Sequence, residues 1–284
     1  MSDFRIDKIT NREGTGTRGT QIAGITTFSG ISGVTIPSGP TSMRYVSNLV
    51  LNKKIPTEGL KVFLDGNITE GRVWPNLAED PNIPDGSYGA SADAEPTISD
   101  YGYDFGGGVS MQGVEIPVNP SKIFNNGEGT IFAFIRPDDI STRQTLVSGY
   151  GNGEHRWDFE LEGSGNLTGG NHDDAYYDAT VDFTVNAWQS FAITLDQKGT
   201  NGEERYNTQK YYLNGALNSS FSQTTGSRGW YGGTDCVLSI ARRSNNKTSF
   251  EYDGEFAIFL AYNRVLSEAE ILSIHNIFKG RYGL

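Results

Sequence analysis

Short apolar stretches with an alternating pattern recur along most of the chain, and turn residues separate them. In residues 188–196 (WQSFAITLD), Phe191, Ile193 and Leu195 alternate with smaller or polar side chains. The same period of two runs through residues 129–137 (GTIFAFIRP). Because successive side chains of a strand point to opposite faces, both segments are predicted to be strands. Many short strands with turns between them predict an all-β sandwich or jelly roll.

The remaining strands are expected at intervals along the same part of the chain. The first covers residues 60–65 and ends at the turn pair Asp65–Gly66. Residues 211–215 (YYLNG) are typical of a strand entering a hairpin, because Asn-Gly is the strongest short hairpin signal. By contrast, residues 78–100 show no strand pattern and are expected to form a long polar loop. Further strands are expected within residues 101–107, 109–118, 144–151, 155–163, 236–243 and 255–267.

One helix is expected near the C-terminus. Residues 267–270 (SEAE) form a capping box, and Leu266 before it can pack against Ile271. Ile271, Ile274 and Phe278 then follow the i, i+3, i+7 spacing of one helix face. Gly280 is expected to end the helix. A single short helix in an all-β chain must pack its apolar face against the sandwich to be stable.

The first part of the chain has a different pattern. Residues 19–43 carry no charge and are rich in Gly, Ser and Thr. They are too polar to span a membrane, and residues 1–13 lack the features of a signal peptide. Two hypotheses remain, a flexible linker and an extended docking arm. Residues 1–57 are taken as the arm with its connector, and residues 58–284 as the folded domain. The apolar positions expected to anchor the arm are Ile22, Ile25, Phe28, Ile31, Val34 and Ile36.

Composition narrows the classes of partner. The chain has 23 basic and 34 acidic residues and a net charge of −11, which argues against nucleic acid because phosphate binding needs a basic surface. No membrane segment is expected. The only cysteine, Cys236, cannot form a disulfide within the chain, so stability must come from a core or from assembly.

Five segments resemble, in order, the motifs of the concanavalin A-like (laminin G-like) jelly-roll family. They are Asp104–Pro117, Gly129–Pro137, Trp188–Asp196, Tyr211–Gly215 and Tyr252–Ile271. The resemblance implies a jelly-roll β-sandwich, here with an extended N-terminal arm and one short C-terminal helix. Most of the matching residues are core and turn positions, so they indicate a fold and not a function. Ile258 stands where the family has an acidic residue in its last strand, which weakens a calcium site of the family type.

A second resemblance concerns the arm. IDKITNR, GTQIAGITTFSG and PSGPT, within residues 5–41, are similar to the N-terminal segment of virion structural proteins in tailed phages of marine cyanobacteria. This resemblance implies a virion protein assembled in the host cytoplasm, as a tail appendage, fibre or capsid decoration. The arm would contact other virion proteins, with the jelly roll displayed outward in several copies or as a homo-oligomer. An uncharged arm rich in β-branched residues suits attachment by strand addition.

Two groups of acidic residues suggest a site, one for glycoside hydrolysis and one for calcium binding. Asp158, Glu160 and Glu162 share one face of a predicted strand, with neighbours about 7 Å apart. Paired carboxylates hydrolyse glycosides, and the spacing is similar to the E-x-D-x-E strand of a jelly-roll glycosidase family. A polar strand face in water is the preferred interpretation, so no enzyme is expected and a depolymerase is the alternative. Asp173, Asp174 and Asp178 form an oxygen-rich loop that suits calcium, although a solvated loop is preferred and no other cofactor is expected.

Aromatic residues near loops are the candidates for binding a host-surface polysaccharide. Trp230 and Tyr231 are flanked by glycines, which predicts that both rings lie on a loop tip. Trp157, Tyr176 and Tyr177 are further candidates, and packing within the fold is the competing interpretation for each of them. The three histidines show neither zinc-site nor triad spacing.

Overall fold

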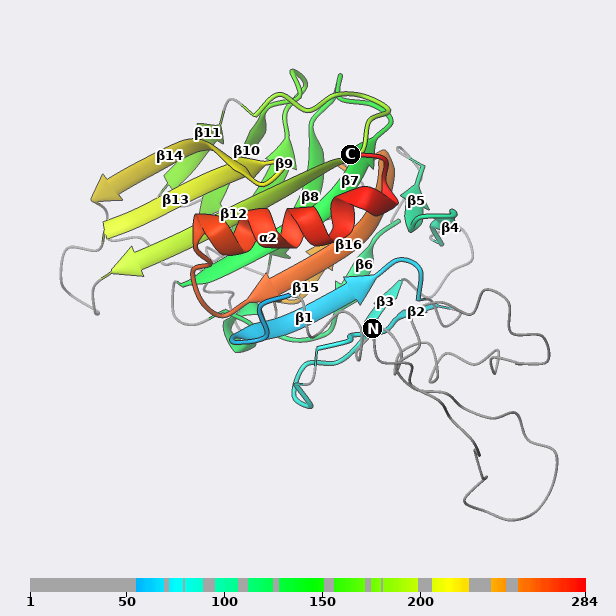
Figure 1. Ribbon diagram of the computed structural model, residues 1–284, viewed down its shortest axis with the longest axis horizontal. Coiled ribbons are helices and arrows are strands. Elements are labelled where there is room, and N and C mark those ends of the chain that lie inside the picture. Colours follow the sequence, from blue (N-terminus) through cyan, green and yellow to red (C-terminus); the bar gives the residue numbers. More distant parts are fainter. Residues whose placement is uncertain are drawn as a thin grey trace, which may run out of the picture.

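Two antiparallel β-sheets pack face to face in the computed structural model (Figure 1). The structure describes residues 55–68, 72–78, 80–88, 95–106, 112–124, 128–150, 156–171, 175–179, 181–198, 206–224, 236–243 and 250–284. At some strand ends it describes the backbone alone, namely residues 150, 156–157, 170–171, 175–178, 197–198, 206–207 and 223–224. No helix in this part of the chain is long and apolar enough to cross a membrane.

Sheet A is built around the longest strands of the fold. Its strands in spatial order are β14 (Ala216–Thr224), β13 (Tyr206–Leu213), β12 (Gln189–Lys198), β7 (Gly129–Pro137), β16 (Gly254–Tyr262), β5 (Tyr103–Phe105) and β4 (Thr97–Ile98). Strand β1 (Leu60–Asp65) also pairs with β16. Because β5 pairs with residues 254–256 and β1 with residues 258–262, the two strands share one edge of β16.

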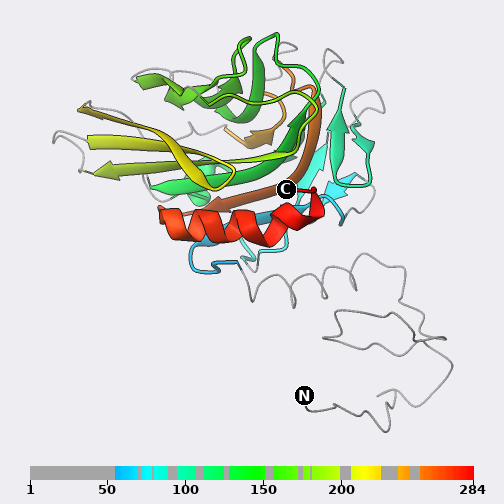
Figure 2. The same cartoon turned by 45° about the horizontal axis from the view of Figure 1, so that its top comes forward.

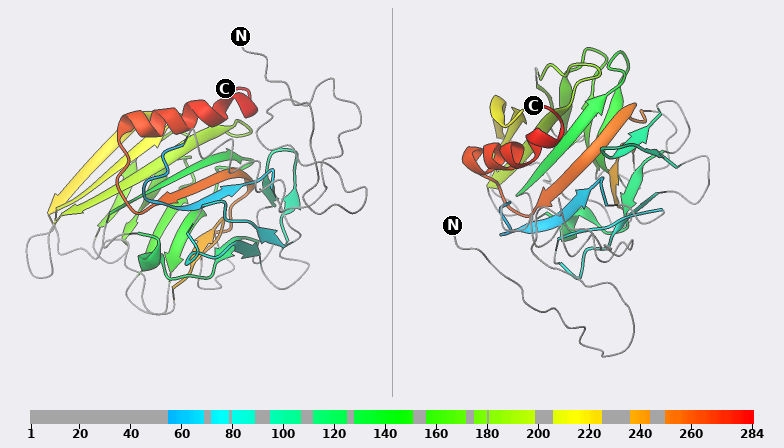
Figure 3. Two further views of the ribbon diagram at one scale, coloured as in Figure 1. Left: turned by 60° about the horizontal axis from the view of Figure 1, so that its bottom comes forward. Right: turned by 45° about the vertical axis from the view of Figure 1, so that its right-hand side comes forward.

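Sheet B lies on the other side of the core (Figure 3). Its strands in spatial order are β11 (Ala175–Ala179), β10 (Leu167–Asn171), β9 (Arg156–Leu161), β8 (Gln144–Tyr150), β15 (Leu238–Ile240), β6 (Val114–Ile116), β3 (Gly86–Tyr88) and β2 (Val73–Trp74). A short 3-10 helix, η2 (Pro120–Lys122), follows β6. The sandwich predicted from the sequence is therefore confirmed.

The alternating patterns place side chains as expected, but both faces of sheet A are buried. Phe191 and Ile193 of β12 lie in the core between the sheets. Phe132 and Phe134 of β7 belong to a second apolar cluster on the outer face of the sheet. This second cluster exists because a helix covers that face.

The predicted helix is α2 (Glu268–Phe278), which lies across the outer face of sheet A (Figure 2). Ser267 and Glu270 form the capping box, and Ile271, Ile274 and Phe278 are buried in the outer cluster, as predicted. The α-helix ends at Phe278 with Lys279 as its C-cap, so the predicted stop next to Gly280 is confirmed. Gly280 itself lies in a 3-10 turn, η3 (Lys279–Arg281), and does not adopt the left-handed conformation of a glycine cap.

Two other turn and loop predictions have different outcomes. The Asn214–Gly215 hairpin turn is confirmed, with φ angles of 51° and 79° that Asn and Gly tolerate. The long loop predicted over residues 78–100 is wrong in part, since β3 and β4 lie within it. These strands have three and two residues, too few to show an alternating pattern without their partners β6 and β5.

Candidate functional site

The acidic strand singled out from the sequence is β9, in the middle of sheet B. Phe159 and Leu161 point into the core between the sheets, so Asp158 and Glu160 lie on the opposite, outer face. Both carboxylates are 0% exposed. The prediction that this face is solvated is therefore wrong.

Two arginines cover Glu160. Arg143 donates from Nε to Glu160 Oε2 at 2.7 Å, and Arg243 donates from Nη2 to Oε1 at 2.8 Å. Thr145 on the neighbouring strand β8 donates from its hydroxyl to Oε1 at 3.0 Å. Both carboxylate oxygens are thus used in a buried, charge-assisted network.

The ring of Phe250 lies against both guanidinium groups, 4.4 Å from Arg243 and 5.2 Å from Arg143. Phe250 has a φ of +77°, a conformation that costs energy for an aromatic residue. Its carbonyl accepts a hydrogen bond from the Thr145 amide at 2.6 Å. This strained residue joins the segment before β16 to β8 and keeps water from the ion pairs.

The polar row continues across sheet B. Asp158 lies 3.5 Å from Arg243 Nε and pairs across the strands with Ser148, which in turn pairs with Ser239. Both serine hydroxyls are buried and have no hydrogen-bond partner among the described residues. Glu162 is different, because it is partly exposed and lies 3.5 Å from Arg143 Nε.

This geometry limits what β9 can do chemically. A glycosidase needs one carboxyl that carries a proton and donates it to the leaving group. Two guanidinium groups at Glu160 favour its ionised form and occupy the oxygens that would hold the proton. Glu160 is suited to holding the fold and is poorly suited to acid catalysis.

The other residues predicted from the sequence are only partly described. The backbone places Trp157 in β9, and Tyr176, Tyr177 and Asp178 in β11, where Asp178 pairs with Thr168. The calcium and glycan candidates Asp173, Asp174, Trp230 and Tyr231 lie outside the described residues. So do the anchoring positions Ile22, Ile25, Phe28, Ile31, Val34 and Ile36. In the described part, no three His, Cys, Asp or Glu side chains are grouped to hold a metal ion.

Sequence reasoning missed an aromatic cluster beside the outer cluster of sheet A, close to the residues that follow α2. The aromatic corner consists of Tyr101, Trp188 and Tyr282. The ring of Tyr101 lies 5.7 Å from that of Trp188, and Trp188 lies 4.6 Å from Tyr282. Nothing in the sequence brings Trp188 to Tyr101, 87 positions earlier.

Acidic residues gather near one end of sheet A. Burial raises the pKa of Asp104, and the charges of Asp138 and Glu255 raise it further. Burial also raises the pKa of Asp138, against the opposing effect of Arg136. Arg136 is paired with Glu255. One arginine therefore serves several carboxylates, which leaves an excess of negative charge.

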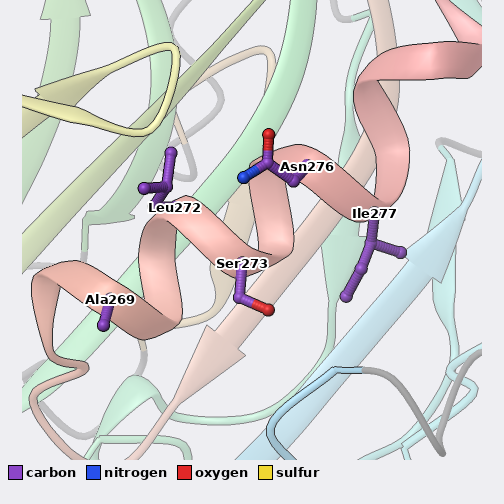
Figure 4. A pocket seen from close by; sticks show the side chains of 5 residues that line it. All are labelled: Ala269, Leu272, Ser273, Asn276 and Ile277. Carbon is purple, nitrogen blue, oxygen red and sulfur yellow. The ribbon is translucent and has the colours of Figure 1, made fainter.

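The outer face of α2 forms a shallow hollow of about 530 Å³ (Figure 4). Its lining residues are uncharged, and they are Ala269, Leu272, Ser273, Asn276 and Ile277. Leu272 is 45% exposed. The hollow holds no group that would direct a reaction.

Comparisons with solved structures identify relatives of the same fold. Trypanosoma rangeli sialidase with 2,3-difluorosialic acid matches at 18% identity and a TM-score of 0.55, over 78% of this chain and 33% of that one. Domain 4 of AbnA, a GH43 extracellular arabinanase from Geobacillus stearothermophilus in complex with arabinotriose, matches at 14% identity and a TM-score of 0.55. The match covers 76% of this chain and 98% of that domain. The botulinum neurotoxin type G receptor binding domain matches at 13% identity and a TM-score of 0.54. The match covers 78% of this chain and 51% of that one.

At these identities the likeness concerns the fold alone, and the chain spans only about 33% of the length of the sialidases it matches. A search of curated protein sequences finds no match. The family model for concanavalin A-like lectins and glucanases, of laminin G type, matches residues 108–272. Because this match covers more than half of the chain, the protein belongs to the concanavalin A-like lectin/glucanases superfamily.

Proposed function

We propose that the protein is a non-enzymatic structural component of a bacteriophage particle, whose jelly roll is displayed outward and binds host-surface glycans. The N-terminal segment would attach it to other virion proteins, in several copies. The observation that carries the proposal is that the described sandwich is built from β1 onward, while residues 5–41, which precede it in the sequence, resemble the N-terminal segment of phage virion proteins.

The first described residue supports this division. Ile55 is 4% exposed and lies in the outer cluster of sheet A with residues of α2. The chain therefore enters the sandwich on the side that carries α2, away from the outer face of sheet B.

The anchor is tested by deleting residues 1–54, which keeps the buried Ile55, and supplying the variant to a phage that lacks its own copy. We expect a soluble, folded protein that is absent from purified particles. A length-matched control replaces Ile25, Phe28 and Ile31 with Asp, and it should fail in the same way because the apolar anchors are lost. Normal incorporation of the deletion variant would show that the anchor assignment is wrong.

Glycan binding is tested separately with residues 55–284, which keep the buried Ile55, on a glycan array and on host cells. The expected result is binding that saturates, without any change in the length of the bound glycans. Changing Trp230 to Ser should reduce binding if that ring contacts the sugar, while particle assembly stays unchanged. No binding to host cells or to their isolated polysaccharide would refute the glycan part of the proposal.

The alternative function is a virion-associated depolymerase that uses Asp158, Glu160 and Glu162. It predicts that the wild-type protein releases reducing ends from a host polysaccharide. Glu160→Gln alone is a poor test, because it also breaks the buried ion pairs. Glu162→Gln is the matched variant, since Glu162 is partly exposed and its loss should spare the fold. Release of reducing ends that Glu162→Gln abolishes would establish the alternative.

A further inference from the structure

We propose that the aromatic corner is a subsite for a neutral saccharide, with the ring of Tyr101 and the indole of Trp188 contacting one sugar ring. This assignment rests on the proposed glycan-binding function and gives it a location on the side of sheet A that carries α2, away from β9 in sheet B. The residues that carry it are all described, and they come from three separate parts of the chain.

The exposure of the corner is the first observation. Tyr101 is 43% exposed, whereas Tyr282 beneath it is only 8% exposed. The rings of Tyr101 and Trp188 meet at 64°, so they form two walls and not one flat surface. A pyranose ring presents a face of C–H groups and a rim of hydroxyls, which suits an apolar wall with polar groups beside it.

The inner rings complete the packing without Tyr101. Tyr282 contacts Phe134 with ring centroids 4.9 Å apart, and Phe134 contacts Phe278 of α2 at 6.2 Å. Trp188 packs on Tyr282 from outside. The ring of Tyr101 adds an outermost layer over these inner rings, and tyrosine and tryptophan rings that are partly wet are enriched at binding interfaces.

The backbone under Tyr101 is held rigidly. Ser99 accepts hydrogen bonds at its hydroxyl from the amides of Tyr101 at 3.2 Å and Gly102 at 3.1 Å, and it donates to Glu255. A Cβ on Gly102 would lie 2.1 Å from the Phe256 carbonyl oxygen, so this turn sits directly on β16. A ring presented from a fixed turn loses little entropy when a ligand binds.

The turn before Trp188 is also held by hydrogen bonds. Gln189 binds both the amide and the carbonyl of Thr184, at 3.2 Å and 3.1 Å, and the amide of Asn186 donates to the Pro137 carbonyl at 2.7 Å. Both walls of the corner therefore have fixed positions before any ligand arrives.

Polar groups beside the corner favour a neutral sugar over an acidic one. With its amide oriented to suit both neighbours, Asn67 donates to the Asp100 carbonyl at 3.2 Å and accepts from Arg281 at 3.3 Å. The charge of Arg281 is matched by Asp65, 2.8 Å away and 1% exposed. Asp100 is exposed nearby and the chain has a net charge of −11, so the surroundings of the corner disfavour a carboxylate sugar.

Four tryptophans give a direct test in the full chain, because each indole N–H yields its own NMR signal. Cellohexaose, maltohexaose and mannohexaose are titrated to millimolar concentration, and Trp188→Phe assigns the signal. We expect the Trp188 signal to shift with at least one of them, while Trp74, which is 0% exposed, stays unmoved as an internal control.

Variants then test whether the ring of Tyr101 also contacts the sugar. Tyr101→Ser should weaken the binding that shifts Trp188 by about tenfold, as expected for loss of one aromatic contact. Tyr101→Phe should retain binding, because the ring remains. Leu272→Ser removes a side chain of similar exposure, 45%, on the outer face of α2 and should change nothing.

Three outcomes would overturn the assignment. They are an unmoved Trp188 signal with all three sugars, a shift confined to Trp157 or Trp230, and equal binding by Tyr101→Ser. A shift confined to Trp157 or Trp230 would leave the proposed glycan function standing and remove only the corner. Absence of binding to host glycans on the array would instead refute the function itself.

Discussion

Two glycines show how closely backbone segments approach one another at the end of sheet A. Gly66 and Gly102 lie against each other, and a Cβ on Gly66 would be 2.4 Å from the Gly102 Cα. A Cβ on Gly102 would meet the backbone of β16. Gly280 in η3 has no atom within 4 Å of the corresponding position. A glycine in the sequence does not reveal which of these situations applies.

Gly102→Ala is expected to lower the free energy of unfolding by about 1–3 kcal/mol, because backbone atoms of Phe256 and Ala257 would have to move. Gly280→Ala, the matched control, should change it by less than about 0.5 kcal/mol. Urea unfolding monitored by fluorescence measures both. Equal effects of the two substitutions would contradict the close approach of the turn to β16.

Asp104 and Asp139 are carboxylates whose surroundings shift the pKa in opposite directions. Burial and neighbouring negative charge raise the pKa of Asp104, so its ionised form destabilises the fold. Hydrogen bonds from the amide and hydroxyl of Ser141 lower the pKa of Asp139, so its ionised form stabilises the fold.

Asp104→Asn is therefore expected to raise stability at pH 7. The gain should shrink as the pH falls through the raised pKa of Asp104, and it should be gone below the unfolded value near 3.8. Asp139→Asn should lower stability at pH 7, with the loss disappearing as the pH falls below about 3.8. Thermal unfolding across this pH range measures both stability changes. If both variants were more stable than the wild type, or both less stable, the opposite pKa shifts of Asp104 and Asp139 would be contradicted.

Glu160→Gln is expected to destabilise the fold by about 3–5 kcal/mol, because two buried guanidinium groups lose their charge partner. Glu162→Gln should cost less than about 1 kcal/mol, since its contact with Arg143 is long and partly exposed. Denaturant unfolding of the two variants gives the comparison. If Glu160→Gln left the free energy of unfolding unchanged, the two arginines would not depend on this carboxylate.

The sequence alone predicted that Asp158 and Glu160 share a face, because the period of two is local. It could not predict their burial. Arg143 lies 17 positions from Glu160 and Arg243 lies 83 positions away, and neither has a local signal that pairs it with β9. A charged residue on a strand looks solvated until its distant partners are known.

Among the elements, α2 was predicted best, since its start and its buried face depend on residues within one short segment. Arg264 pairs with Glu270, and Ser267 donates to the same carboxylate at 2.9 Å. These contacts, with Arg264 first, lower the pKa of Glu270 to about 2. The short strands β3 and β4 were missed because two or three residues acquire an extended structure only through their partners.

Glu270→Gln tests the contribution of this cap. The ionised carboxylate stabilises the fold above its unfolded pKa of 4.5, and this contribution is lost as the pH falls towards about 2. At pH 7 the variant should lose about 1 kcal/mol of stability. Glu268→Gln, in the same helical turn but outside the capping box, is the control. A difference between Glu270→Gln and wild type that persisted at pH 2 would contradict this account.

For the whole molecule, the order of motifs was sufficient to predict a two-layer jelly roll, because each motif specifies a strand and its inward side. The pairing of β15 between β8 and β6 was not predictable from those patterns, since it joins residues more than ninety positions apart. The aromatic corner arises in the same way, from three segments that meet only after both sheets have formed.

The position of β16 has a consequence for how the protein is made. This strand pairs with β7 on one side and with β1 and β5 on the other, although it is the last strand in the described part of the chain. During synthesis, the edges of β1 and β7 must therefore wait for residues 254–262 to leave the ribosome. Such non-local pairing folds slowly and leaves unpaired edges exposed meanwhile. Chains stalled with only residues 1–250 emerged should remain sensitive to protease, and resistance at that length would show that the rest of the sandwich folds first.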